Sequence, residues 1–320
     1  MFRGIFAVLF AALGIAAQSH AQDYPNKTIR LVAPFAAGAT LDILGRIVAQ
    51  NLSESLGKPV IVENRPGANG LIGSNVVAKA APDGYSLLLM TPSTLYASPS
   101  LYSQMSFDPG KDLVPVSKLG NTDFVLIAGA NFPANTLKDL LAMAKSEPGK
   151  RTMAHKSLTA QLGVEWLKQI AGIDINTVSY KDASAAFVDL SSGQLDTLFE
   201  PVPSSIAQIR AGKVKALAVA ASQRSSVLPN VPTVIESGFP GFDTSVEAII
   251  YAPAGTPKEI IAKLHGEIVK IVNLPAVKEK FAQLGMEAIT STPERLAEAA
   301  KSEPAKWSRI IKNANIPKIN

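Results

Sequence analysis

The feature that most constrains this chain is a buried strand, a loop of small residues and an amphipathic helix within residues 28–55. The strand is predicted at 28–33 and the loop, built from Pro, Phe, Ala and Gly, at 34–39. The helix is predicted from four apolar residues at helical spacing, Leu41, Leu44, Val48 and Leu52. The first N–H groups of such a helix lack partners within it, and its dipole is positive there. The loop therefore delivers either an anion-binding site or an ordinary connection that binds nothing.

The same order of strand, loop and helix recurs once more, and a third strand follows it. A strand at 59–63 runs into a glycine-rich loop at 64–70, and a strand at 85–90 ends in small hydroxyl residues. This repetition is typical of an α/β fold with a parallel sheet. Because ligands of such sheets bind at the carboxyl ends of the strands, three ligand-ready loops are expected to converge.

A second α/β domain is predicted from the strand at 124–128, after which the βα pattern restarts. A strand at 243–253 is expected to return to the first domain, where a predicted helix over 292–313 breaks at Glu303-Pro304. We therefore predict domain 1 from residues 22–122 and 248–320 and domain 2 from 123–247. Two crossing strands would form a hinge and place a cleft between the domains.

Composition narrows the class of protein. Residues 1–21 read as a signal peptide, with Arg3, an apolar run and a small-x-small cleavage site, so export is expected. The absence of Cys excludes disulfides and thiolate catalysis. The net charge of +5 is scattered, which disfavours nucleic-acid binding and suits a small anionic ligand. No P-loop, G-x-S-x-G or zinc motif occurs, so we expect a binding protein without cofactor or metal, and not an enzyme.

Four side chains are candidates with two interpretations each. Asp42, in the first turn of the first helix, would favour the helix dipole and tie the loop down, or contact a ligand. His155 and Lys156, in a predicted loop over 153–157, would donate to a carboxylate, or form an exposed pair. Glu200 would accept from a ligand amine or hydroxyl, or pair with Arg210.

Taken together, the motifs resemble those of a known family, the extracytoplasmic solute receptors of the tripartite tricarboxylate transporter system (the Bug, or TctC-like, family). The resemblance covers essentially the whole mature chain. It is carried by the segments at 34–42, 63–70, 81–88, 180–181, 193–196, 211–219 and 228–233.

The resemblance implies a type II periplasmic binding-protein fold and a small organic carboxylate as ligand. Carboxylate capture would fall on the first two loops and on the first helix, at Phe35, Ala36, Ala37, Gly38, Ala39, Thr40, Asp42, Ala68, Asn69 and Gly70. Selectivity would fall on Thr91, Ser93, His155, Lys156, Ser157, Thr159, Ala183, Ser184, Ala185 and Glu200. It further implies a monomer in the periplasm whose partners are membrane transporter subunits. The alternative role is a ligand sensor of the same fold that signals to a membrane partner.

Three departures from the family pattern bear on the ligand. Ala39 stands where a Gly is usual, and its methyl narrows the approach to the backbone. His155-Lys156 is bulkier and more basic than the usual Gly- and Ser-rich loop, and Asp182 and Glu200 also replace usual residues. These differences indicate an altered ligand, either a dianion or a polar acid, or a receptor that has lost its original ligand.

Overall fold

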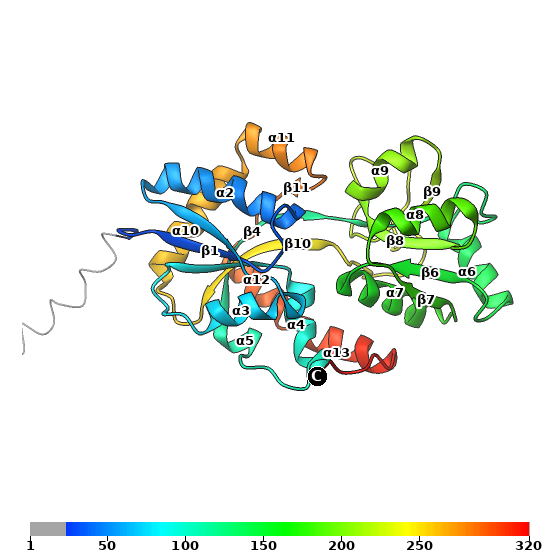
Figure 1. The fold of residues 1–320 in the computed structure, drawn as a ribbon, viewed down its shortest axis with the longest axis horizontal. Helices are drawn as coiled ribbons and strands as arrows, with labels where there is room; N and C mark the ends of the chain where they lie inside the picture. Colours follow the sequence, from blue (N-terminus) through cyan, green and yellow to red (C-terminus); the bar gives the residue numbers. More distant parts are fainter. Residues whose placement is uncertain (1–23, 320) are drawn as a thin grey trace, which may run out of the picture.

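The computed structural model describes residues 24–319, which fold into two lobes, each built on its own β-sheet (Figure 1). The first lobe contains β1 (Ile29–Ala33), β2 (Val60–Asn64), β3 (Ser86–Met90), β4 (Leu113–Thr122), β10 (Val246–Pro253) and β11 (Glu287–Ala288). The second lobe contains β5 (Phe124–Gly129), β6 (Thr152–His155), β7 (Asn176–Ser179), β8 (Thr197–Pro201) and β9 (Val214–Val219). The strand orders are β11-β4-β10-β3-β1-β2 and β7-β6-β8-β5-β9. The predicted signal peptide lies outside the described residues.

Helices cover both faces of each sheet. In the first lobe they are α2 (Thr40–Leu56), η1 (Ala68–Gly70), α3 (Leu71–Ala78), α4 (Pro92–Leu101), α5 (Pro109–Asp112), α10 (Lys258–Val272), α11 (Pro275–Gln283), α12 (Pro293–Ala300) and α13 (Glu303–Asn313). In the second lobe they are α6 (Leu137–Ser146), α7 (Leu158–Ala171), α8 (Ala183–Ser192) and α9 (Val202–Arg210). Buried apolar side chains form separate clusters on the two faces of each sheet. Among the described residues, none of the helices combines the length and apolar content that crossing a membrane requires.

The parallel part of the first sheet brings the three predicted loops to one edge. β1 pairs in parallel with β2 on one side and with β3 on the other. The carboxyl ends of these strands therefore lie together, and the loops that lead to α2, α3 and α4 start from the same edge. β10 and β4 complete the sheet in the antiparallel direction, as expected for strands that connect the lobes.

Strands β6 and β4 differ from the sequence prediction, and helix α4 was not predicted. The segment predicted as a loop over 153–157 begins with strand β6, which runs to His155 because Met153 and Ala154 are fully buried between neighbouring strands. Strand β4 was not predicted, since Pro115 and Gly120 interrupt its pattern. Pro115 lies at a register shift opposite Tyr251, where a strand tolerates proline. The break in the last helix is confirmed, because α12 ends at Ala300 and α13 begins at Glu303.

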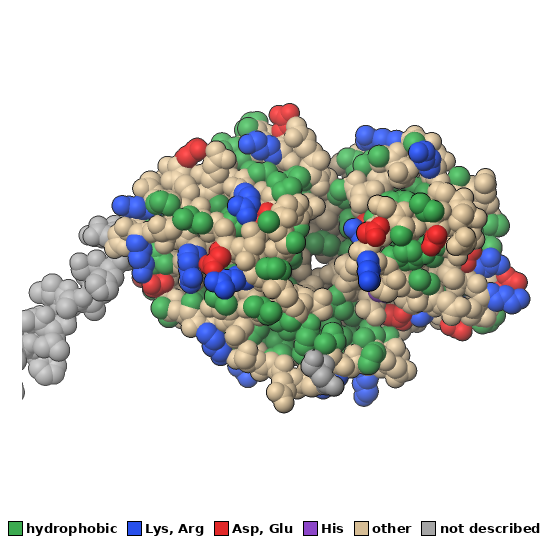
Figure 2. Space-filling view, in the orientation of Figure 1, with side chains coloured by type: hydrophobic (Ala, Val, Ile, Leu, Met, Phe, Trp, Pro, Cys, Tyr) green, Lys and Arg blue, Asp and Glu red, His purple; other side chains and the backbone are tan. Residues whose placement is uncertain are grey.

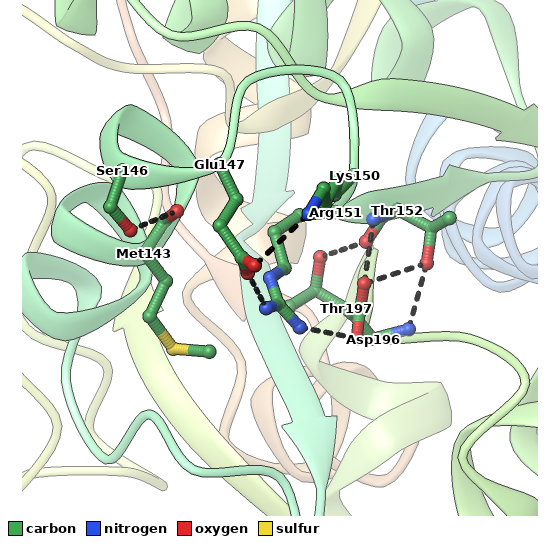
Figure 3. Close-up of polar contacts among 8 residues, drawn as sticks. All are labelled: Met143, Ser146, Glu147, Lys150, Arg151, Thr152, Asp196 and Thr197. Atoms are coloured by element: carbon green, nitrogen blue, oxygen red, sulfur yellow. Dashed lines mark hydrogen bonds and ion pairs between the residues drawn. The ribbon is translucent and has the colours of Figure 1, made fainter.

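Figure 3 shows a polar network at the starts of β6 and β8. These starts lie at the edge of the second sheet opposite the one where β5 enters at Phe124, because Thr197 pairs with Ala128 and Pro201 with Phe124. Asp196 accepts hydrogen bonds from the Thr152 backbone N–H at 2.8 Å and from its hydroxyl at 3.2 Å. Arg151 pairs with Glu147 and lies 3.8 Å from Asp196. The network ties the start of β6 to the start of β8 and to the end of α6.

Two segments cross between the lobes, and a polar cluster joins them. Asp123 follows β4, and Asp243 and Ser245 precede β10. The Ser245 hydroxyl lies 3.3 Å from Asp123 Oδ1 and 2.6 Å from Asp243 Oδ1. Burial first, then repulsion from Asp243, raises the pKa of Asp123 to about 6. The folded protein therefore holds a proton on Asp123 that the unfolded chain releases near pH 4.

We expect the contribution of Asp123 to the free energy of unfolding to decrease as the pH rises from about 4 to about 6. A carboxyl group whose pKa is raised by folding stabilises the folded state below its unfolded pKa and loses that contribution above its folded pKa. The measured quantity is the free energy of unfolding of the Asp123→Asn variant minus that of the parent. This difference should be about 1–3 kcal/mol more favourable to the variant at pH 7 than at pH 4. Urea unfolding of both proteins at the two pH values measures this change. An equal difference at both pH values would contradict the assignment.

Candidate ligand-binding site

The first loop presents the start of helix α2 without a side-chain cap. Ala39, the residue before the helix, has extended backbone and offers no hydroxyl or carboxylate to the first turn. Ala36, Ala37 and Gly38 are exposed, and Gly38 has a φ of 84°, in the left-handed region that favours glycine. The loop leaves the positive end of a 17-residue helix open to an anion.

Asp42 holds this loop in place, as one of its two interpretations predicted. Its side chain is buried, and its Oδ2 accepts hydrogen bonds from the Gly38 N–H at 2.9 Å and from Arg46 Nε at 3.1 Å. Burial alone would raise the pKa of Asp42, but hydrogen bonds from Asn64, Gly38 and Arg46 outweigh it and place the pKa below its ordinary value. Asp42 is thus ionised, with both oxygens engaged by the protein.

Asn64 joins the first loop to the second, and sequence reasoning missed it. Its side-chain amide donates to Asp42 Oδ1 at 2.7 Å and to the Phe35 carbonyl at 3.2 Å, and it accepts from Arg46 at 2.7 Å. The backbone N–H of Arg65 also donates to the Ala33 carbonyl at 3.0 Å. The two loops therefore form one unit fixed by side chains from both.

The second loop has an unusual backbone. Four consecutive residues have positive φ, namely Gly67, Ala68, Asn69 and Gly70 with values of 125°, 46°, 52° and 91°. Such a conformation is costly for Ala and Asn, and strain of this kind concentrates at ligand-binding loops. The Asn69 amide donates to the Tyr102 hydroxyl at 2.9 Å, and no side chain caps the start of α3. This is a second helix start that presents backbone N–H groups to the same edge.

The third loop contacts the second lobe directly. Ser93, near the start of α4, has its Oγ 3.2 Å from Thr159 Oγ1 at the start of α7, and Thr94 Oγ1 lies 3.4 Å from the same atom. Thr91, just before α4, is buried and makes no side-chain cap. The structure thus brings two predicted selectivity residues, Ser93 and Thr159, together between the lobes. Figure 2 shows the hollow that separates the two lobes.

The second lobe places His155, Lys156 and Glu200 at its facing edge. Glu200 is fully buried in β8, and its Oε1 accepts from Lys156 Nζ at 2.9 Å and from the Ser204 hydroxyl at 2.6 Å. Its partner is therefore Lys156, and the predicted alternative of Arg210 is wrong. His155 is buried at the end of β6, so the interpretation of an exposed pair is wrong for it. Burial lowers the pKa of His155, so its imidazole is neutral at pH 7.

The starts of α7 and α8 in the second lobe differ from those of α2 and α3 because their own side chains cap them. Ser157 Oγ accepts from the Ala160 N–H at 3.2 Å at the start of α7. Asp182 Oδ1 accepts from the Ala185 N–H at 3.0 Å at the start of α8, whose first turn holds Ala183 and Ser184. The anion positions of these helices are already filled by protein oxygens.

A cavity of about 870 Å³ lies between the lobes along the two crossing segments. It is lined by residues of both segments and of α13, and of the predicted ligand residues only Ser93 reaches it. Two charged residues that line it, Lys118 and Glu247, pair with each other at 2.5 Å. The starts of α2 and α3 lie outside this cavity, and their uncapped backbone N–H groups make them the stronger anion site. Within residues 24–319, no group of three or more His, Asp or Glu side chains is arranged to hold a metal ion.

Comparisons with known proteins agree with this architecture. The family described as tripartite tricarboxylate transporter family receptor (TctC) matches residues 44–316. The chain is 35% identical to protein BugT of Bordetella pertussis over 311 residues, which cover 96% of this chain and 95% of BugT.

Two solved structures with ligands are similar in fold. Rpa4515 of R. palustris with adipate is 30% identical, with a TM-score of 0.76 over 93% of this chain and all of that one. MatC of Rhodopseudomonas palustris with bound malate is 29% identical, with a TM-score of 0.72 over 90% of this chain and all of that one. The family match spans most of the chain and includes most of α2, the second loop and both crossing segments, so the chain belongs to the TctC family of tripartite tricarboxylate transporter receptors.

Proposed function

We propose that this protein is a periplasmic receptor that captures a small organic carboxylate between its lobes and delivers it to the membrane subunits of a tripartite tricarboxylate-type transporter. The observation that carries the proposal is the pair of uncapped helix starts, at α2 and α3, on loops that Asp42 and Asn64 tie together. Backbone N–H groups at such ends favour a carboxylate. The adipate and malate bound by two similar proteins support the same ligand class.

In this proposal the two lobes have different tasks. The carboxylate lies against residues 35–40 and against Ala68, Asn69 and Gly70, while Asp42 holds the first loop and need not contact the ligand. Thr91, Ser93, Thr159 and the edge of the second lobe select the rest of the ligand. Closure occurs by rotation about the two crossing segments, a motion that periplasmic binding proteins exemplify among hinge-closing proteins.

A thermal-shift screen of the mature protein against mono-, di- and tricarboxylates, amino acids and aromatic acids tests the proposal. A ligand at about 100 times its Kd adds roughly 2.7 kcal/mol to the free energy of unfolding, which is readily seen as a rise in Tm. We expect such a rise with at least one carboxylate and none with the corresponding neutral amide. Folded protein that responds to no carboxylate would contradict the proposed function.

A further inference from the structure

We propose that the ligand carries, besides the carboxylate held by the first lobe, a second polar group that donates a hydrogen bond to Glu200, such as an ammonium, an amide or a hydroxyl. A ligand that ends in a second bare carboxylate is disfavoured. This inference rests on the proposed function, because it narrows the ligand class of the same site.

The inference starts from Glu200, because one of its two carboxylate oxygens has no hydrogen-bond partner among the described residues. The side chain is 0% exposed, and Oε1 already accepts from Lys156 and Ser204. Oε2 is buried and has no hydrogen-bond partner among the described residues. Buried carboxylate oxygens are nearly always paired with donors, since burial removes their contact with water. We therefore expect Oε2 to accept a hydrogen bond from a group outside the chain.

The topology places Glu200 at the edge that faces the first lobe. Strand β5 enters the second sheet directly from Asp123, so Phe124 marks the edge nearest the first lobe. Antiparallel pairing sets Glu200 opposite Val125, one residue further in. β6 runs parallel to β8, so His155 and Lys156 reach the same edge, a few residues before Thr159 contacts Ser93. A ligand between the lobes thus meets this cluster.

The charges at this edge do not suit a second carboxylate. Lys156 supplies the ammonium of the cluster, and Glu200 already neutralises it at 2.9 Å. The carboxylate of Asp182 occupies the start of α8, and the hydroxyl of Ser157 caps α7. A second ligand carboxylate would therefore meet like charges in a partly buried place, where repulsion is weakly screened.

The imidazole of His155 is neutral, so it offers a ligand a hydrogen bond but no positive charge that would balance a second carboxylate. Its side chain is 6% exposed, and its Nδ1 has no hydrogen-bond partner among residues 24–319. A neutral imidazole offers one donor and one acceptor, which matches an amide or a hydroxyl better than a carboxylate. His155 and Glu200 come from neighbouring strands, but the register aligns His155 with Phe199, so the two side chains lie on opposite faces of the sheet and would contact different groups of a ligand.

Isothermal titration with matched pairs of acids tests the inference on the unaltered protein. The pairs are adipate with 6-aminohexanoate and 6-hydroxyhexanoate, succinate with 4-aminobutanoate, and terephthalate with 4-(aminomethyl)benzoate. Within the pair that binds most tightly, we expect the donor-ended acid to have a Kd at least tenfold lower than the diacid. A diacid that binds equally or more tightly would overturn the inference and leave the proposed carboxylate receptor intact. If neither these acids nor those of the broader screen bind, both the inference and the proposed function fail.

The Glu200→Gln variant provides a second, residue-level readout. The amide keeps the shape and removes the negative charge, so the ammonium-ended acid should lose at least tenfold in affinity while the diacid gains. Glu147→Gln is the matched control, because it makes the same substitution at the opposite edge of the second sheet, and it should leave every affinity unchanged. An unchanged preference in a folded Glu200→Gln protein would also overturn the inference. The titrations on the unaltered protein decide the question even if this variant does not fold.

Discussion

Replacing Trp307 by Ala is expected to lower the free energy of unfolding by about 3–5 kcal/mol, because the substitution removes a large ring from the core. Trp307 is 1% exposed on α13, and its Nε1 donates to Glu303 at 2.6 Å. Its ring meets Trp166 of the second lobe edge-on, with 6.3 Å between ring centroids, and Lys306 lies over both rings. Truncation leaves a cavity at the contact between the lobes. Urea unfolding followed by tryptophan fluorescence and circular dichroism measures the loss.

Two variants serve as controls for this prediction. Trp307→Phe keeps an aromatic ring at the contact and should cost clearly less than Trp307→Ala. Val188→Ala removes an apolar side chain that is 65% exposed on α8 and should change stability by no more than about 0.5 kcal/mol. A Trp307→Ala protein as stable as the Val188→Ala protein would show that α13 does not brace the lobes.

Asp42→Ala is expected to have the second-largest effect, on both stability and ligand affinity. The substitution leaves donors from Gly38, Arg46 and Asn64 without their shared acceptor, all three in a part-buried site. We expect a loss of about 2–4 kcal/mol in the free energy of unfolding. The first loop then no longer holds its N–H groups in place, so the Kd for a carboxylate should rise at least tenfold, or about 1.4 kcal/mol.

Asp196→Ala is the matched control for Asp42→Ala. Asp196 also accepts hydrogen bonds that join separate segments, from the N–H and hydroxyl of Thr152, but at the far edge of the second sheet (Figure 3). The Asp196→Ala substitution should lower the free energy of unfolding by about 1–3 kcal/mol and leave the Kd for the carboxylate within twofold of the parent value. Equal effects of both substitutions on Kd would mean that Asp42 acts on global stability and not on the loop.

Local rules predicted the parts of the site that lie close in sequence. The place of Asp42 in the first helical turn was enough to predict that it ties the loop down, because Gly38 is only four residues away. The convergence of three loops followed from the repeated βα order, because parallel strands end at a common edge. The fold and the family were likewise accessible from the sequence.

Contacts between distant residues were not accessible in the same way. Asn64 lies 22 residues from Asp42, and no local pattern marks it as the link between the loops. Arg210 was an alternative partner for Glu200 only because it is near in sequence, whereas the actual partner, Lys156, directly follows the neighbouring strand β6. Helix α4 was missed since seven of its ten residues are buried, which removes the amphipathic pattern that normally reveals a helix.

The most direct test of the central claim is a backbone amide NMR titration of the protein with the carboxylate that gives the largest thermal shift. If the first lobe holds the carboxylate through backbone N–H groups, the largest shifts will come from the amides of residues 36–41 and 68–71, with smaller shifts near Lys156 and Glu200. Shifts confined to the cavity along the crossing segments, around Lys118 and Ser245, would place the ligand elsewhere and contradict the account.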